Sequence, residues 1–137
     1  MALVIDQITA QVITDAEPAA GAASASAEID LGDNALVQSI IVYTAVGADG
    51  WAAAPAGNKK LTVSILPRQA TSGGNYANEP AMSISHTVDT DGAYLFADVF
   101  NPGALPRYFV ITVLNDTNQN MATDALDVWI EYVKVTS

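Results

Sequence analysis

The clearest alternation of apolar and polar side chains in the sequence is Met82-Ser83-Ile84-Ser85-His86-Thr87-Val88. Alternate positions place Met82, Ile84, His86 and Val88 on one face and Ser83, Ser85 and Thr87 on the other. A period of two is that of a β-strand with one buried face. The stretch therefore predicts a half-buried strand, and the turn residues Asp89–Gly92 end it.

Similar short runs, rich in Val, Ile and Thr, lie on both sides of this stretch and are bounded by Gly, Pro, Asn or Asp. These runs are 3–14, 27–31, 36–46, 61–66, 94–100, 107–114 and 126–135. We expect a bulge near Gln7 and Ile8, where the alternation slips, and Pro67 should end the run 61–66. The count is eight strands, or seven if 27–31 is only a loop.

Helix signals are weak along the whole chain. The Ala-rich stretch 16–27 is interrupted by Pro18 and Gly21 and holds no apolar side chain larger than alanine, so it cannot build a helical stripe facing a core. We therefore predict an all-β protein, an antiparallel β-sandwich of about eight strands that is jelly-roll-like rather than immunoglobulin-like. An N-terminal strand and extended Ala/Ser-rich arm would occupy 1–27, and the β-sandwich domain 28–137.

Composition narrows the range of partners. The 137 residues suit one domain, and 15 acidic against 5 basic side chains give a net charge of -10. That charge has the wrong sign for binding nucleic acid or an anionic membrane, so we expect neither as a partner. The N-terminal ten residues do not look like a signal peptide. The lack of cysteine excludes disulfides, thiolate metal sites and cysteine nucleophiles.

Residues with catalytic or metal-binding chemistry are scarce. His86 is the only histidine, and no nucleophile motif accompanies it, so a structural role is expected. Asp89, Asp91 and Gly92 resemble the start of a calcium loop without its closing Glu, and turn formation explains them equally well. The oxygen-rich segment 115–127 is either a solvated acidic loop or a calcium site. We predict no catalytic, cofactor-binding or metal-binding residue and no enzyme.

Two runs carry more apolar side chains than a sandwich needs. The run 107–114 has Phe109, Ile111 and Val113 on one face and Tyr108, Val110 and Leu114 on the other, and 36–46 is similar. Either loops cover the second face or it meets another chain. Trp51 lies in a loop and either inserts into a partner or plugs its own loop. The predicted partner-binding residues are Leu3, Ile5, Trp51, Tyr108 and Val110.

The chain resembles small bacteriophage capsid decoration, or cement, proteins. The features that carry the resemblance are the extended start Met1–Ile5, the Ala/Ser arm 19–27 and the β-rich remainder, with the closing runs 107–113 and 127–132. The resemblance covers most of the chain. The resemblance implies a protein on the outer surface of the virion capsid, with the major capsid protein as its partner. It also implies a homotrimer that holds neighbouring capsomers together without catalysis, attached here through residues 3–27.

Two other functions fit the same features. Another phage structural component, from a tail, neck or fibre, would differ only in location. A carbohydrate-binding β-sandwich module would use Trp51, Tyr76 or Tyr94 as platforms on which sugar rings stack.

Overall fold

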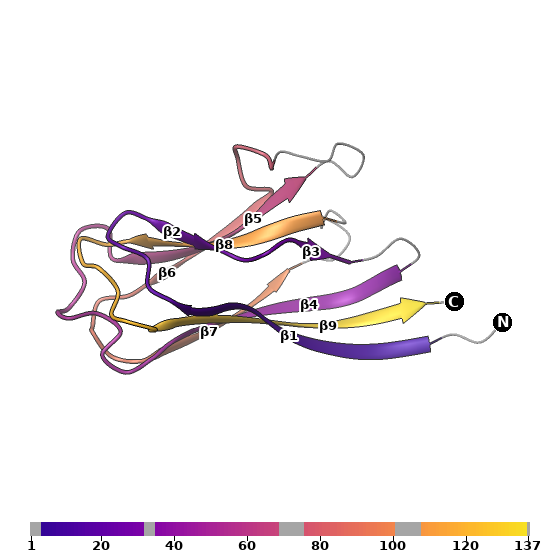
Figure 1. The fold of residues 1–137 in the computed structure, drawn as a ribbon, viewed down its shortest axis with the longest axis horizontal. Coiled ribbons are helices and arrows are strands. Elements are labelled where there is room, and N and C mark those ends of the chain that lie inside the picture. Colours follow the sequence, from indigo (N-terminus) through magenta and orange to yellow (C-terminus); the bar gives the residue numbers. More distant parts are fainter. Residues whose placement is uncertain (1–3, 32–34, 69–75, 101–107, 137) are drawn as a thin grey trace.

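The chain folds into two antiparallel β-sheets packed face to face, as Figure 1 shows. The computed structural model describes residues 4–31, 35–68, 76–100 and 108–136. The strands are β1 (Val4–Ala16), β2 (Ala23–Ala25), β3 (Ile29–Asp30), β4 (Ala35–Val46), β5 (Lys60–Arg68), β6 (Met82–Thr87), β7 (Tyr94–Phe100), β8 (Tyr108–Asp116) and β9 (Leu126–Thr136). Within these described ranges there is no helix long and apolar enough to cross a membrane.

The strand order is that of a jelly roll. Sheet A has the order β1-β9-β4-β7, and sheet B has the order β2-β8-β5-β6, with β3 also paired to β8. Because β2 and β3 both lie along β8, they count as one interrupted strand. The eight resulting strands run 1-8-3-6 and 2-7-4-5 in chain order, which is the jelly-roll arrangement. The predicted all-β antiparallel sandwich is confirmed.

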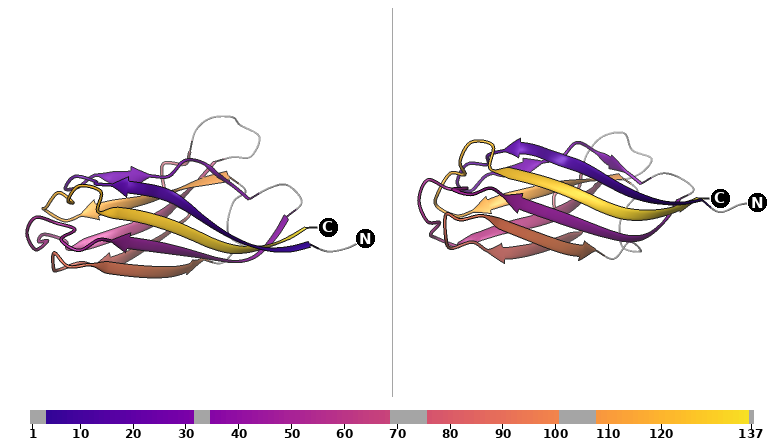
Figure 2. Two further views of the ribbon diagram at one scale, coloured as in Figure 1. Left: turned by 60° about the horizontal axis from the view of Figure 1, so that its bottom comes forward. Right: turned by 90° about the horizontal axis from the view of Figure 1, so that it is seen from below.

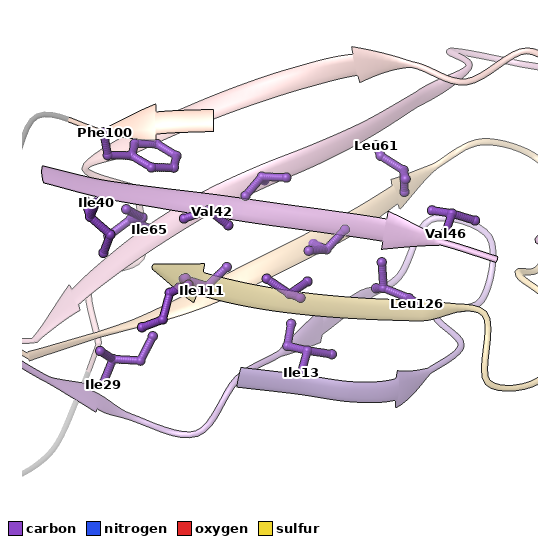
Figure 3. Packing of buried hydrophobic residues seen from close by; sticks show 14 of the residues in the cluster. Ile13, Ile29, Ile40, Val42, Val46, Leu61, Ile65, Phe100, Ile111 and Leu126 are labelled. Carbon is purple, nitrogen blue, oxygen red and sulfur yellow. The ribbon is translucent and has the colours of Figure 1, made fainter. Parts of the chain in front are cut away.

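The hydrophobic core lies between the two sheets and is built by the period-two pattern (Figure 3). On β8, Phe109, Ile111 and Val113 are fully buried, and the positions between them face away from the core. Val42 and Val128 of sheet A are also fully buried and belong to the same core. On β4, β8 and β9, alternate side chains are therefore buried in the core, as the sequence pattern predicts.

The N-terminal segment is part of this sandwich. β1 pairs with β9 from Val4 to Ala16, and Ile13 is only 5% exposed in the core. β2 pairs with β8, and the N–H of Gly21 donates to the carbonyl of Asn115. These main-chain hydrogen bonds offset the entropy of ordering a small-residue segment. Residues 4–27 are thus a strand and an extended stretch, and the sheets show no break at residue 27.

Two local expectations are wrong. The irregularities of β1 fall between Gln11 and Ala16 and not at Gln7 and Ile8. β5 also continues through Pro67 to Arg68. Proline has no backbone N–H to donate, but its carbonyl can still accept a hydrogen bond. Here the Pro67 carbonyl accepts one from the N–H of Ala77.

Candidate interaction surface

Sheet A turns one face to the core and the other to the outside. The register of its strands defines the outer face, and Figure 2 (right) shows the four strands side by side. The described outward positions are Ile5, Gln7, Thr9 and Gln11 of β1, Asp127, Trp129, Glu131, Val133 and Val135 of β9, Ile41, Tyr43 and Ala45 of β4, and Leu95, Ala97 and Val99 of β7. We call this set the outer face of sheet A.

Exposed apolar side chains gather on this face. The large hydrophobic residues that stay exposed within the described ranges are Val4 (49%), Ile5 (68%), Leu95 (69%), Val99 (69%) and Trp129 (40%). All five belong to sheet A, and all but Val4 are on its outer face. Single exposed apolar residues are ordinary, whereas a gathered set is typical of a protein-binding surface.

The half of the face formed by β1 and β9 combines apolar and acidic groups. Trp129 lies between Asp127 and Glu131, two positions away on either side. The Asp127 carboxylate accepts a hydrogen bond from Gln11 Nε2 (2.8 Å), and the Glu131 carboxylate accepts one from Gln7 Nε2 (2.7 Å). The two glutamine side chains are neutral, so these hydrogen bonds do not cancel the negative charges of Asp127 and Glu131. We call this part the acidic half, and it fits a partner with apolar and basic side chains.

The half formed by β4 and β7 is neutral. Its outward residues are Ile41, Tyr43, Ala45, Leu95, Ala97 and Val99, and none is charged. We call this part the neutral half.

The predicted partner-binding residues fall in different places. Ile5 lies on the acidic half and is 68% exposed, and Leu3 is outside the described residues. Val110 lies on the other sheet and is only 8% exposed within the single chain. Tyr108 is partly buried, with the Arg68 guanidinium 4.2 Å from its ring centroid. The single chain therefore already covers much of the second apolar face of β8.

Trp51 is not the exposed aromatic that the sequence allowed. Its side chain is fully buried and packs edge-on against Tyr94, with ring centroids 6.1 Å apart. Trp51 forms a β-bridge with Met121, and the N–H of Ala122 donates to the carbonyl of Gly50. Two loops at one end of the sandwich therefore enclose it, and it acts as a plug.

Trp129 is the tryptophan that remains accessible, although it was not among the predicted partner-binding residues. The alternation of β9 could have predicted that Trp129 points outwards, because its neighbours Val128 and Ile130 are buried.

His86 has a structural position. Its Nε2 lies 2.8 Å from Asp98 Oδ2, and its ring stacks on Phe96 with centroids 4.1 Å apart. His86 belongs to β6 of sheet B, whereas Asp98 and Phe96 belong to β7 of sheet A. The pair therefore joins the two sheets along one side of the sandwich.

A second polar cluster lies at the end of β5. Glu28 Oε1 accepts hydrogen bonds from Arg68 Nε and from the Tyr76 hydroxyl (2.8 Å). The hydrogen bond from Arg68 is the main cause that lowers the pKa of Glu28, and the carboxylate in turn raises the pKa of both Arg68 and Tyr76. The cluster neutralises Arg68 and ties together segments distant in sequence.

The oxygen-rich segment after β8 makes internal hydrogen bonds. Asn115 is fully buried and donates through Nδ2 to the carbonyls of Pro18 and Gln119, while its Oδ1 accepts from the Thr117 hydroxyl. Among the described residues, no group of three or more His, Cys, Asp or Glu side chains could hold a metal ion. These hydrogen bonds hold the loop between β8 and β9 through Asn115 and Thr117.

Comparison with known proteins gives no indication of function, so the proposal below rests on this surface and on the fold. The sequence matches no protein-family model and no curated protein.

Proposed function

We propose that the chain is a viral structural protein without enzymatic activity, a head decoration protein that binds the outer surface of a capsid and stabilises contacts between capsomers. Its partner would be the major capsid protein. The observation that carries the proposal is the acidic half, where Trp129 stays exposed between two carboxylates and Ile5 stays exposed further along the same pair of strands. The jelly roll is an architecture that viral capsid proteins use, which supports the proposal by analogy of fold.

The chemistry of the acidic half suits attachment to another protein. Tryptophan is the side chain most often found among the few residues that dominate binding energy. Asp127 and Glu131 on either side of Trp129 would face basic groups of the partner and fix the orientation. Many copies on one shell would multiply a modest contact.

The same observations support a non-catalytic role. His86 is held by Asp98 and stacked on Phe96, between the sheets. The carboxylates nearest the exposed tryptophan are held by glutamine side chains. The carbohydrate-binding alternative loses its first platform, because Trp51 is fully buried. A tail, neck or fibre role would use the same surface at another place in the virion.

The test is co-sedimentation of the purified chain with heads that lack it, prepared from the virus whose genome encodes it. We expect the wild-type chain to bind, and Trp129→Ala to weaken binding by about 30-fold, the loss typical of a dominant interface residue. Ile5→Glu should also weaken binding. The matched control is Thr87→Glu, which adds the same charge at an exposed position of sheet B. No binding to heads, or equal binding by Trp129→Ala and the wild type, would overturn the proposal.

A further inference from the structure

Among the described residues, each sheet has two edge strands that pair with one neighbour only. These four edges differ in how readily they could pair with a strand of another chain. β2 and β3 are three and two residues long. β1 has register irregularities between Gln11 and Ala16. β6 turns hydroxyl side chains outwards. β7 pairs with β4 in unbroken register from Tyr94 to Phe100 and has no proline or lysine, two residues that commonly block edges.

The β7 edge is complementary to itself. If two copies lie antiparallel with Ala97 opposite Ala97, then Leu95 of each copy faces Val99 of the other, and Tyr94 faces Phe100. An alignment shifted by one residue would place outward side chains opposite core side chains, so the two faces exclude it. Among the alignments that keep the faces matched, the one centred on Ala97 is the one that pairs all seven residues of β7. Leu95 and Val99, each 69% exposed, would then cover one another.

Charge does not oppose this pairing at the contact itself. The neutral half brings no charged residue to it. The one carboxylate on β7, Asp98, points inwards, is 6% exposed and is hydrogen-bonded to His86. In the aligned pair it would stand opposite Phe96 of the second copy, not opposite another carboxylate. The Asp127 and Glu131 carboxylates lie on β9, separated from β7 by β4.

We propose that two copies of the chain pair antiparallel through their β7 edges, centred on Ala97, so that the two copies of sheet A form one continuous sheet. Main-chain hydrogen bonds would supply affinity, and the Leu95–Val99 contacts would supply register. The contact has two-fold symmetry and gives a dimer, whereas the trimer expected from the resemblance would require a different contact. The inference does not depend on the proposed function, because the acidic half remains free.

The decisive test is cross-linking by single cysteines, since the natural chain has none. In the aligned pair the two Ala97 Cβ atoms would be about 4.5–5.5 Å apart, close to the separation a disulfide needs. The two Leu95 positions would be about 13 Å apart, from the rise per residue of a strand. Oxidation should therefore link Ala97→Cys into a covalent dimer and leave Leu95→Cys monomeric. Mixing Leu95→Cys with Val99→Cys should give the mixed dimer.

Several outcomes would overturn the inference. One is linkage of Ala97→Cys no faster than that of Thr9→Cys, an exposed cysteine on the far strand of the same sheet. Another is linkage of Leu95→Cys alone, which would indicate a different packing of two copies.

Sedimentation equilibrium provides a second measurement on the chain without cysteine. We expect a wild-type dimer that becomes tighter with added salt, because salt screens the repulsion between two copies of charge -10. Leu95→Lys should weaken dimerisation at least tenfold, since lysine on an edge strand blocks pairing. Thr9→Lys, the charge-matched control, should not weaken it. A monomer at all concentrations, a trimer, or equal effects of the two lysines would contradict the proposal.

Discussion

His86 Nε2 and Asp98 Oδ2 lie 2.8 Å apart and connect β6 of one sheet to β7 of the other. The His86 ring stacks on Phe96, Phe96 stacks on Tyr94, and Tyr94 meets the edge of Trp51. A row of rings therefore runs from the open side of the sandwich to the plug beneath its loops.

Removing the histidine should destabilise the fold. In His86→Ala the carboxylate of Asp98, 6% exposed, loses its partner, and a buried polar group left unpaired costs about 1–3 kcal/mol. Urea denaturation measures the change in the free energy of unfolding. Asp91→Asn, in the exposed turn before β7, is the control and should change it by less than about 0.5 kcal/mol. Equal stability of the two variants would show that the His86–Asp98 contact contributes nothing.

The two tryptophans should behave in opposite ways. Trp51→Ala should cost about 3–5 kcal/mol, because it empties a fully buried site. Trp51→Phe should cost much less, since the Trp51 indole N–H has no hydrogen-bond partner to lose. Trp129→Ala should cost far less than Trp51→Ala, because Trp129 is 40% exposed. Thermal and urea denaturation of the three variants give the ranking, and a larger cost at Trp129 than at Trp51 would contradict the assignment.

Gly50 should be intolerant of a side chain. A Cβ added there would come within 2.3 Å of Val46 Cγ1, a core atom at the end of β4. Gly50→Ala should therefore cost about 1–3 kcal/mol, the usual range for overpacking. Gly92→Ala is the matched control, because its nearest neighbour would be 3.4 Å away. Equal midpoints of urea unfolding for the two variants would disprove the close approach.

Glu28 should make stability depend on acid pH. Its pKa in the folded chain lies below the ordinary value of 4.5, chiefly because Arg68 donates a hydrogen bond to it. The stabilisation is therefore complete above pH 4.5 and disappears as the pH falls through the lowered folded-state pKa. Melting temperatures of the wild type and Glu28→Gln should differ at neutral pH and converge in acid. A difference that stayed constant down to acid pH would exclude this ion pair as its source.

Much of the fold follows from local pattern in the sequence. β7 was predicted with the bounds observed, and β4, β6 and β9 to within one residue at either end, because each has clear alternation and flanking turn residues. The continuation of β5 beyond Pro67 could not be foreseen, since it depends on pairing with Phe109 and Tyr108 of β8, a strand distant in sequence. The integration of residues 4–27 likewise depends on pairing with β8 and β9, more than 85 residues away in sequence.

The candidate surface was only partly predictable. The sequence names Ile5 among the partner-binding residues, and the structure leaves this side chain exposed on the outer face of sheet A. The alternation also marks the run 36–46 as apolar on both faces. It could not separate Trp51 from Trp129, because the burial of Trp51 arises from a loop that closes over it through Met121. The covering of Val110 also depends on packing that has no local signature.

An electron cryomicroscopy reconstruction of the particles that carry this chain would show where the sandwich is attached. We predict density for the sandwich on the outside of the shell, with Trp129 and Ile5 of the acidic half against the major capsid protein and basic capsid side chains within reach of Asp127 and Glu131. Particles without the sandwich on their surface, or a sandwich attached through the outer face of sheet B, would contradict the account.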